Sequence, residues 1–295
     1  MKLRGYEFNF DEYGVTIDGI RDFDPNHTFG CGQCFRWQRE ADGSHTGVVR
    51  GRVANVVYTP GKLVLNNVST EDFDHVWFDY FDLGRDYAEI KKAVAIDDIM
   101  RKAVEFGGGI RLLRQEPWET LISFILSSNN RIPRIMKIIE DISRLYGSEL
   151  KFRGRNYHAF PDVQSLAACS LEQIEACRAG YRCGYIQRTA ADIAAGVFEL
   201  QKLAGLDTAD ARNYLLQLHG VGSKVADCML LYSGTKQDVF PTDVWVKRVM
   251  EELYFKREAS FKEVQQFAAE HFGEHAGIAQ QYLFYYAREH KIGVK

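Results

Sequence analysis

One lysine and one aspartate in the second half of the chain have residue types and surroundings suited to nucleophilic chemistry. Lys224 ends the segment His219-Gly220-Val221-Gly222-Ser223-Lys224, and Asp243 follows Phe240-Pro241-Thr242. A lysine amine can in general act as a nucleophile, and a carboxylate can stabilise positive charge. The spacing alone does not assign these roles to the two residues.

Two helices joined by a glycine turn would present this lysine. Helical spacing of apolar residues runs up to the turn, Gly220 and Gly222 allow a tight bend, and a second helix is predicted to begin at Ser223. The unpaired N–H groups of such a turn can bind a phosphate, although the motif is not a Walker loop. Asp243 can cap a helix predicted over 244–254. Taken alone, the pattern also fits an ordinary helical hairpin and a simple helix cap.

The first hundred residues predict a different kind of structure. Short β-type runs are separated by the turn-prone stretches 41–44 and 59–61, which is typical of an antiparallel meander. A helix is predicted over 87–105 before Gly107-Gly108-Gly109. We therefore predict an α+β protein with an N-terminal antiparallel β-sheet domain, 1–114, and a helical domain, 115–295. The predicted strands are 34–38, 45–49, 53–58 and 62–65.

Beyond residue 114 nearly every segment has helical periodicity. Apolar residues recur at helical spacing over 118–126, after Pro117, and again over 132–142. These two helices are joined at Asn129-Asn130. Capping-box spacing at Ser170…Gln173 and Ser260…Glu263 predicts further helix starts near 171 and 261.

Total charge argues against a generic nucleic-acid binder, but the charge is unevenly distributed. The chain has 37 Lys and Arg against 40 Asp and Glu, net −3, where a basic excess would be usual. Residues 1–100 are net −6, residues 101–160 are net +5, and residues 161–295 are net −2. One segment is therefore basic.

The sequence also predicts a cytoplasmic protein that needs neither metal nor cofactor. No run approaches the roughly 18 apolar residues of a membrane helix, and the first residues lack the apolar core of a signal peptide. Six cysteines are too few for a disulfide framework in a chain of this length and are expected to be reduced. Cys31-Gly32-Gln33-Cys34 has the form of a redox or zinc site, but no second ligand pair or thioredoxin-like pattern accompanies it.

Two motifs in the second half of the chain carry a specific family resemblance. The pattern L-x-x-L-x-G-V-G-x-K-V-A-D over 215–227, followed by P-x-D-V over 241–244, resembles the helix–hairpin–helix and Gly/Pro-Asp motif of DNA glycosylases. Within that superfamily, segments dispersed from residue 29 to 284 resemble the 8-oxoguanine DNA glycosylase/AP lyases. No cysteine follows Cys228, so the four-cysteine iron–sulfur cluster of the endonuclease III branch cannot form. The matching segments are 30–37, 111–115, 124–130, 157–161 and 180–182.

The resemblance implies a base-flipping enzyme with lyase activity. Lys224 would attack C1′ of the flipped nucleotide to leave a Schiff base, and Asp243 would assist, with strand cleavage by β-elimination. Because the amine must first lose its proton, this role implies a desolvated setting or the positive potential of a helix start. The Gly32 carbonyl would accept the N7 hydrogen that distinguishes 8-oxoguanine from guanine. Gln280 would read the Watson–Crick edge, and the base would lie between Cys228 and Phe284.

The resemblance also implies how the duplex is held. Asn129, Arg134 and Arg182 would bond the orphaned cytosine, and Tyr181 would enter the base stack. Gly220 and Gly222 of the hairpin, together with Trp245, would lie against the DNA backbone. Three positions depart from the family pattern: Trp245 stands where a His near the backbone is typical, His219 replaces a Pro, and Arg131 replaces an Asn.

The expected partner is therefore double-stranded DNA containing 8-oxoguanine opposite cytosine, bound by a monomer at the nucleoid and not at a membrane. Two alternatives remain open from the sequence. The same scaffold could act on another damaged base, such as an alkylated purine, because pocket residues and not the Lys/Asp pair select the substrate. The chain could also be a non-catalytic helix–hairpin–helix DNA-binding protein.

Overall fold

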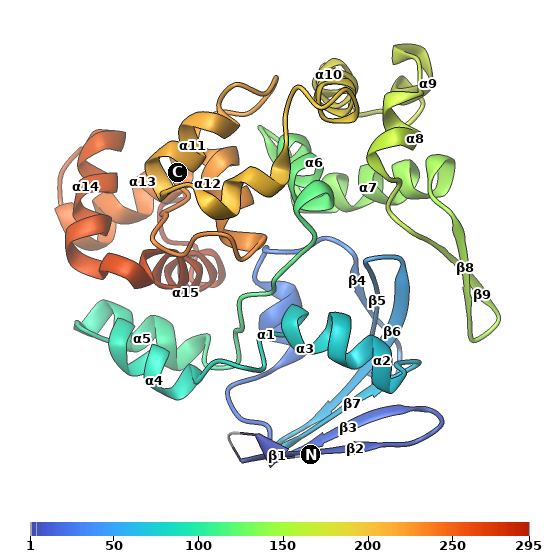
Figure 1. Cartoon of the computed structure of the whole chain (residues 1–295). Coiled ribbons are helices and arrows are strands. Elements are labelled where there is room, and N and C mark those ends of the chain that lie inside the picture. Colours follow the sequence, from blue (N-terminus) through green and yellow to red (C-terminus); the bar gives the residue numbers. More distant parts are fainter. Residues whose placement is uncertain (1, 4, 295) are drawn as a thin grey trace.

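The computed structural model describes residues 2, 3 and 5–294, which form a β-sheet region and a helical region side by side (Figure 1). Within the described residues, one antiparallel sheet has the strand order β1-β2-β3-β7-β6-β5-β4. Its strands are β1 Lys2–Leu3, β2 Tyr6–Phe10, β3 Gly14–Asp18, β4 Trp37–Arg39, β5 His45–Val49, β6 Arg52–Thr59 and β7 Lys62–Asn66.

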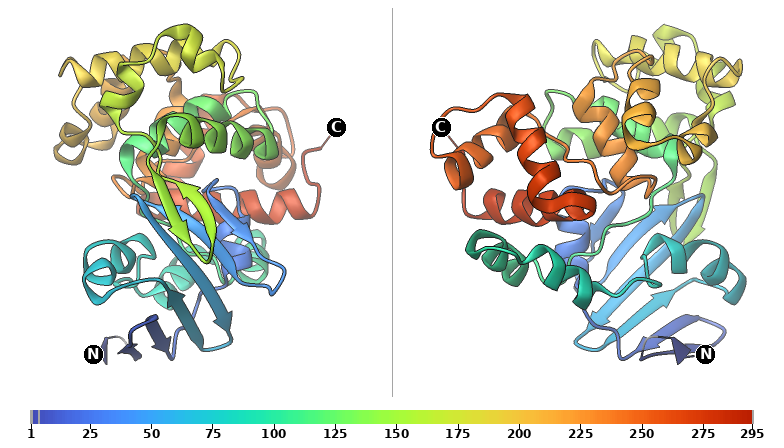
Figure 2. Two further views of the ribbon diagram at one scale, coloured as in Figure 1. Left: turned by 90° about the vertical axis from the view of Figure 1, so that its right-hand side faces the viewer. Right: turned by 60° about the vertical axis from the view of Figure 1, so that its left-hand side comes forward.

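One face of this sheet is covered by a short helical stretch and shares an aromatic core with it. Phe73, Trp77 and Phe81 are fully buried there, and the helical stretch lies beside the sheet in the views of Figure 2. Burial of such large rings supplies most of the driving force for packing the two layers. The stretch consists of α2 Thr70–Asp72, the π-helical turn η1 Phe73–Trp77 and α3 Phe78–Tyr80.

The predicted meander is confirmed for its last three strands and differs at its first. The strand predicted over 34–38 begins only at Trp37. The reason is that Gln33 is fully buried and donates from Nε2 to the carbonyls of Thr28 and Arg111, each at 2.8 Å, so side-chain bonds hold this segment as a loop. Strands β1, β2 and β3 were not predicted.

The helical region comprises most of the rest of the chain. Both predicted capping boxes are present, at Ser170 and at Ser260, and the helices predicted after Pro117 and before Gly147 are confirmed. The helices are α1 Pro25–Gly30, α4 Tyr87–Val94, α5 Asp98–Phe106, α6 Pro117–Ser127, α7 Ile132–Tyr146, α8 Val163–Ala167, α9 Leu171–Glu175, α10 Arg182–Ala194, η2 Leu200–Gly205, α11 Thr208–Leu215, α12 Ser223–Tyr232, α13 Val244–Met250, η3 Glu251–Phe255, α14 Phe261–Phe272, η4 Gly273–His275 and α15 Ala276–Glu289.

Two local predictions were wrong. The single helix predicted over 87–105 is two helices, because the Asp97 side chain accepts a bond from the backbone N–H of Met100 at 2.8 Å and so starts α5 anew. The region beyond residue 114 also contains a β-hairpin, β8 Glu149–Phe152 and β9 Arg155–His158. Arg153 and Gly154 both have positive φ, as a tight hairpin turn requires.

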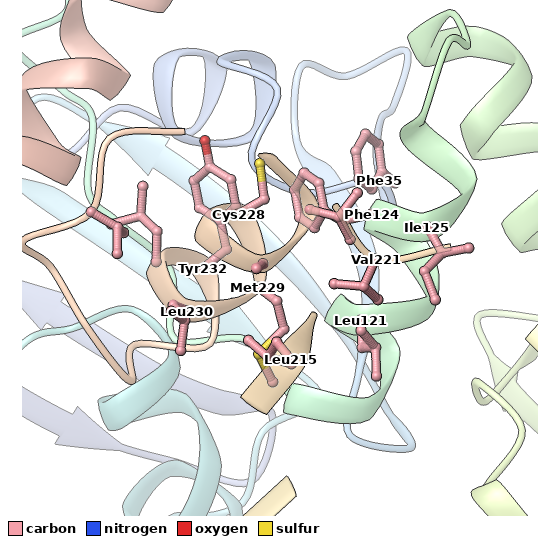
Figure 3. Packing of buried hydrophobic residues seen from close by; sticks show 14 of the residues in the cluster. Phe35, Leu121, Phe124, Ile125, Leu215, Val221, Cys228, Met229, Leu230 and Tyr232 are labelled. Atoms are coloured by element: carbon pink, nitrogen blue, oxygen red, sulfur yellow. The ribbon is translucent and has the colours of Figure 1, made fainter. Parts of the chain in front are cut away.

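The buried apolar residues form two clusters, one under the sheet and one among the helices. In the helical cluster α6 packs against α12, with Phe124 stacked on Tyr232 at a ring distance of 5.0 Å (Figure 3). Residues of α4 and α5, together with Phe35, also belong to the helical cluster. Packing therefore crosses residue 114, and the division of the chain at that position stays a prediction.

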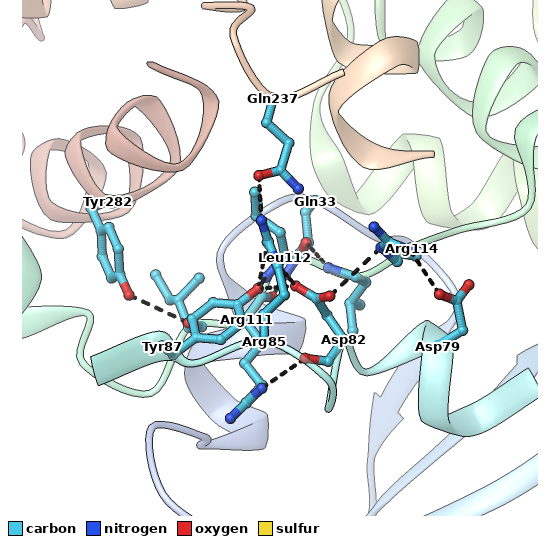
Figure 4. A network of polar contacts seen from close by, with 12 residues as sticks. Gln33, Asp79, Asp82, Arg85, Tyr87, Arg111, Leu112, Arg114, Gln237 and Tyr282 are labelled. Carbon is cyan, nitrogen blue, oxygen red and sulfur yellow. Dashed lines mark hydrogen bonds and ion pairs between the residues drawn. The ribbon is translucent and has the colours of Figure 1, made fainter. Parts of the chain in front are cut away.

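A buried polar network joins the two regions (Figure 4). Arg111 is fully buried and donates to the carbonyl of Asp82 at 2.9 Å and to the hydroxyl of Tyr6 at 2.6 Å. The Asp82 carboxylate accepts from Tyr87 at 2.8 Å, and Arg85 reaches from there to Gln237 of the helical region. A buried charge is tolerated only with such partners, so the network fixes how the regions meet. No helix among the described residues is long and apolar enough to cross a membrane.

Candidate active site

A cavity of about 130 Å³ lies between α6, α12, α13, α15 and the loop after α1. It brings together the six residues that the sequence predicts for catalysis and base binding, drawn from four separate parts of the chain. A larger groove of about 500 Å³, between α7, β5 and the β8–β9 hairpin, contains none of them. The six residues are Gly32, Lys224, Cys228, Asp243, Gln280 and Phe284.

Lys224 lies in the first turn of α12, directly after the hairpin. Gly222 is the N-cap of α12 and provides no side-chain capping bond, so backbone N–H groups point out of the helix start. The Lys224 Nζ donates to the Ser127 Oγ at 2.8 Å and lies 5.2 Å from the centroid of the Phe124 ring. Lys224 is half-buried, and it lies in the first turn of a helix, where the potential is positive.

Cys228 lies one helical turn after Lys224 and forms an apolar wall of the cavity. Burial raises the pKa of the Cys228 thiol to about 11, against the opposing effect of the Lys224 ammonium. The thiol is thus uncharged near neutral pH. A neutral, polarisable sulfur can contact the face of a base without adding a competing charge next to the amine.

Asp243 begins α13, and the predicted helix cap is confirmed. Its Oδ1 accepts a hydrogen bond from the backbone N–H of Val246 at 2.8 Å. The preceding loop is held by Gln265, whose Nε2 donates to the Phe240 carbonyl at 2.7 Å and to the Thr242 hydroxyl at 2.9 Å. These bonds fix the position from which the carboxylate lines the cavity.

The loop carrying Gly32 approaches α15 closely. Gly32 has φ +91°, a conformation that favours glycine, and a Cβ there would lie 3.1 Å from the Phe284 ring, which would have to move slightly. The Gln281 Nε2 donates to the Cys31 carbonyl at 3.0 Å, and the Tyr232 hydroxyl donates to the Gln281 amide oxygen at 2.7 Å. Two helices thereby hold the glycine loop in place.

Gln280 and Phe284 lie four residues apart on α15 and both line the cavity. The Gln280 amide oxygen is buried and has no hydrogen-bond partner among the described residues. Because an unpaired buried acceptor is costly, it is suited to a polar edge of a ligand. Phe284 contacts Trp245 edge-on at 5.1 Å, and the Trp245 indole donates to the Ile292 carbonyl at 3.2 Å.

The two thiols of the C-x-x-C segment are buried. Burial raises the pKa of Cys31 to about 12, so this thiol is neutral near pH 7. No group of three or more metal-ligating side chains occurs within the part of the chain that the structure describes.

The residues predicted to hold the duplex gather around the turn between α6 and α7. Tyr181 is 58% exposed, as a wedge residue must be, and its ring stacks on the guanidinium of Arg182 at 4.4 Å. Arg182 is almost wholly buried instead, and donates to the carbonyls of Ser128 and Asn129. Asn129 is exposed and adopts the left-handed conformation, φ +47°.

The other predicted DNA contacts lie at helix starts and at the hairpin. Arg134 is exposed in the first turn of α7, with its Nη2 3.5 Å from the Arg178 carbonyl. Gly220 has φ +78° and lies directly against the ring of Tyr185, which leaves no space for a Cβ. Gly222 faces open space, where a phosphate could approach the start of α12.

Sequence reasoning missed the residues that hold these groups in position. Gln33 and Gln281 hold the glycine loop, and Ser127 contacts the Lys224 amine. Ser127 and Gln33 stand inside motifs that were recognised, but their partners lie 97 and 78 residues away. The spacing of neighbouring residues cannot indicate contacts between residues so far apart in the sequence.

Family models match nearly the whole chain. Residues 18–121 match the N-terminal domain of 8-oxoguanine DNA glycosylase, and residues 122–274 match the HhH-GPD superfamily of base excision DNA repair proteins. The chain belongs to this family of DNA repair glycosylases.

Known proteins similar to this chain are also DNA glycosylases or lyases by name. A probable N-glycosylase/DNA lyase of Methanothermobacter thermautotrophicus is 38% identical over 200 residues, 61% of this chain and 64% of that protein. A solved structure of MBOgg1 with a low affinity DNA ligand is 46% identical, with a TM-score of 0.95 over 99% of this chain and 100% of the other. The Clostridium acetobutylicum 8-oxoguanine glycosylase/lyase, bound to double-stranded DNA with cytosine opposite 8-oxoguanine, is 41% identical, with a TM-score of 0.94 and the same coverage.

Proposed function

We propose that this glycosylase flips 8-oxoguanine paired with cytosine out of duplex DNA, excises it and cleaves the strand at the abasic site. The observation that carries the proposal is the single cavity in which an amine, a carboxylate, a backbone carbonyl and two base-stacking side chains meet. A base inside a duplex is inaccessible, so the nucleotide must enter this cavity extrahelically. The excision of 8-oxoguanine by similar proteins supports the choice of lesion.

Recognition of the lesion rests on hydrogen-bond polarity. Guanine presents a bare N7, which repels a carbonyl oxygen, whereas 8-oxoguanine carries a hydrogen at N7 that the Gly32 carbonyl can accept. The unpartnered Gln280 oxygen would accept from the Watson–Crick edge, where guanine derivatives carry N–H donors. Cys228 and Phe284 would stack on the two faces of the base.

The covalent chemistry follows from an amine beside a carboxylate. The Lys224 Nζ forms a bond to C1′ while the C1′–N9 bond breaks, and the base leaves with that electron pair and takes up a proton. The nitrogen then loses its extra proton, the bond from C1′ to the ring oxygen opens, and a Schiff base to Lys224 remains. Loss of a C2′ proton lets the C3′–O bond break with phosphate as leaving group. Asp243 stabilises the positive charge that develops at C1′.

The duplex would be held by the start of α12 on the lesion strand and by the Asn129 turn on the other strand. Tyr181 would fill the gap, while Asn129, Arg134 and Arg182 bond the orphaned cytosine. Arg182 would have to exchange its bonds to the Ser128 and Asn129 carbonyls for bonds to the base. We further propose that the enzyme acts as a monomer in the cytoplasm, on nucleoid DNA.

Borohydride trapping on a duplex with 8-oxoguanine opposite cytosine tests the proposal. Reduction of the Schiff base should give a stable protein–DNA adduct with the wild type and none with Lys224→Gln. The absence of a wild-type adduct, or an undiminished adduct with Lys224→Gln, would contradict the role of the lysine. Excision of an alkylated purine in preference to 8-oxoguanine would contradict the choice of substrate.

A further inference from the structure

The amine of Lys224 is held by a hydroxyl group that comes from a different helix. Ser127 is the last residue of α6, and its Oγ lies 2.8 Å from the Lys224 Nζ. The same hydroxyl donates to the Phe124 carbonyl at 2.7 Å. A hydroxyl has a single hydrogen, so Ser127 can only accept from the amine. The direction of this hydrogen bond is therefore set by the end of α6.

A second residue at the same end of α6, Phe124, also contacts the amine. The Phe124 ring lies 5.2 Å from the Lys224 Nζ and is itself held by stacking on Tyr232 and by an edge contact with Phe35 at 5.5 Å. Ser127 and Phe124 are one helical turn apart, so both contact Lys224 from one face of the helix. The support is rigid because Phe124 is buried in the helical core.

A lysine side chain needs such support to react efficiently. Its four-carbon stem is flexible, and attack on C1′ requires the nitrogen lone pair to point at the carbon. A neutral primary amine has two N–H groups and one lone pair. When one N–H is engaged by Ser127, rotation about the Cε–Nζ bond is restricted, and the lone pair is confined to the directions that remain.

We propose that Ser127 is a positioning residue that aims the Lys224 amine into the base cavity. The inference rests on the proposed function, because it requires Lys224 to be the nucleophile. Ser127 lines the cavity together with Lys224 and Asp243, but it acts through the lysine and forms no bond to the substrate. Its effect should therefore appear in the rate of the covalent step and not in affinity for the duplex.

The test compares Ser127→Ala, Ser127→Cys and Ser127→Thr with wild type on two duplexes, one with 8-oxoguanine opposite cytosine and one with a preformed abasic site. Ala removes the acceptor, Cys keeps the volume but accepts only weakly, and Thr keeps the hydroxyl. Ala and Cys should slow single-turnover borohydride trapping on both duplexes by at least tenfold, about 1.4 kcal/mol. KM should stay within about twofold and Thr should restore trapping to within about threefold of wild type.

Ser123→Ala is the matched control, because Ser123 is a buried serine one turn earlier on α6 and does not line the cavity. It should trap at the wild-type rate. Thermal melting of every variant shows whether a slower trapping rate results from a loss of folding or from a misplaced amine. If Ser127→Ala does not fold, Ser127→Cys replaces it in the comparison. Trapping by both Ala and Cys at the wild-type rate, or a change confined to KM, would overturn the inference. A wild type that forms no adduct would instead overturn the role of Lys224 itself.

Discussion

Gly32 has a conformation that the fold requires, and its carbonyl is the one proposed to recognise the base. Its φ of +91° places the backbone in a region that side chains avoid, and a Cβ there would lie 3.1 Å from the Phe284 ring. A residue with a Cβ would therefore have to displace the ring by a few tenths of an ångström.

Gly32→Ala should lower both stability and excision. The left-handed conformation costs a residue with a Cβ about 1–2 kcal/mol, and the new methyl group must push Phe284 away. We expect a reduced free energy of unfolding in urea and a loss of discrimination between 8-oxoguanine and guanine. Gly30→Ala is the control, because Gly30 has open space and no positive φ. Equal effects of the two substitutions would refute this reasoning.

The residues of the cavity were largely predictable, whereas the residues that support them were not. Lys224 and Asp243 stand in a motif whose residue types and spacing indicate chemistry, and the predicted cap by Asp243 is confirmed. Ser127 and Gln33 act through bonds that span 97 and 78 residues. Such bonds depend on how helices and loops pack, which sequence spacing cannot express.

At the scale of elements, α13 and α15 are linked through the side chain of Trp245. Trp245 on α13 contacts Phe284 on α15 edge-on, and its indole donates to the Ile292 carbonyl in the segment after α15. The next residue, Gly293, donates to the Glu252 carboxylate at 2.9 Å. The chain after α15 thus folds back and joins the helix of Asp243 to the helix of Phe284.

Replacement of Trp245 should weaken this link in two separable steps. Trp245→Phe keeps the ring contact and loses the hydrogen bond, which should cost about 0.5–1.5 kcal/mol of stability. Trp245→Ala also removes the ring, so it should unfold at a lower denaturant concentration and raise KM for the 8-oxoguanine duplex more than Phe does. Urea unfolding and steady-state kinetics measure both effects. A KM that is unchanged in the Ala variant would contradict the link to Phe284.

Helices were predicted correctly where apolar residues recur at helical spacing over several turns. The helices α6 and α7 each show several turns of regular spacing, and both were predicted. The β8–β9 hairpin was missed because its four-residue strands are half exposed and rich in charged residues, so they show no buried face. The break before α5 depends on one capping aspartate, Asp97, within an otherwise helical pattern.

For the molecule as a whole, the basic segment 101–160 is less positive at its surface than its sequence suggests. Arg111 is buried, whereas Arg134 is among the exposed groups near the Asn129 turn. Arg155 and Arg114 are paired with carboxylates from outside the segment, those of Glu40 and Asp79.

Binding to undamaged duplex should therefore depend only modestly on salt. Each phosphate neutralised by the protein contributes about −0.9 to the slope of log K against log salt concentration. We expect a slope that corresponds to a few phosphates, measured by fluorescence anisotropy over a range of salt concentrations. A slope that matches about ten or more phosphate contacts would contradict the pairing described above.

Stability should depend on pH through Glu119, which lies where α6 meets the loop after α1. Burial raises the pKa of the Glu119 carboxyl to about 7, against the opposing effect of Arg36. The folded state thus favours the protonated form, and its contribution to stability is full below about pH 4.5 and is lost as pH rises through about 7. Between about pH 5 and pH 8 the wild type should lose melting temperature relative to Glu119→Gln. A difference that is independent of pH would contradict this.

The loop of Gly32 has a consequence for how such enzymes can diversify. The carbonyl proposed to distinguish the lesion comes from the loop between α1 and β4, whereas the amine and carboxylate of the proposed chemistry come from α12 and the start of α13. The proposed N7 contact and the bond breaking are thus encoded in separate parts of the chain that meet only in the folded molecule, whereas Gln280 and Phe284 contribute to base binding from the helical half. A changed glycine loop could therefore alter the contact to N7 while the amine chemistry and the stacking side chains stay the same.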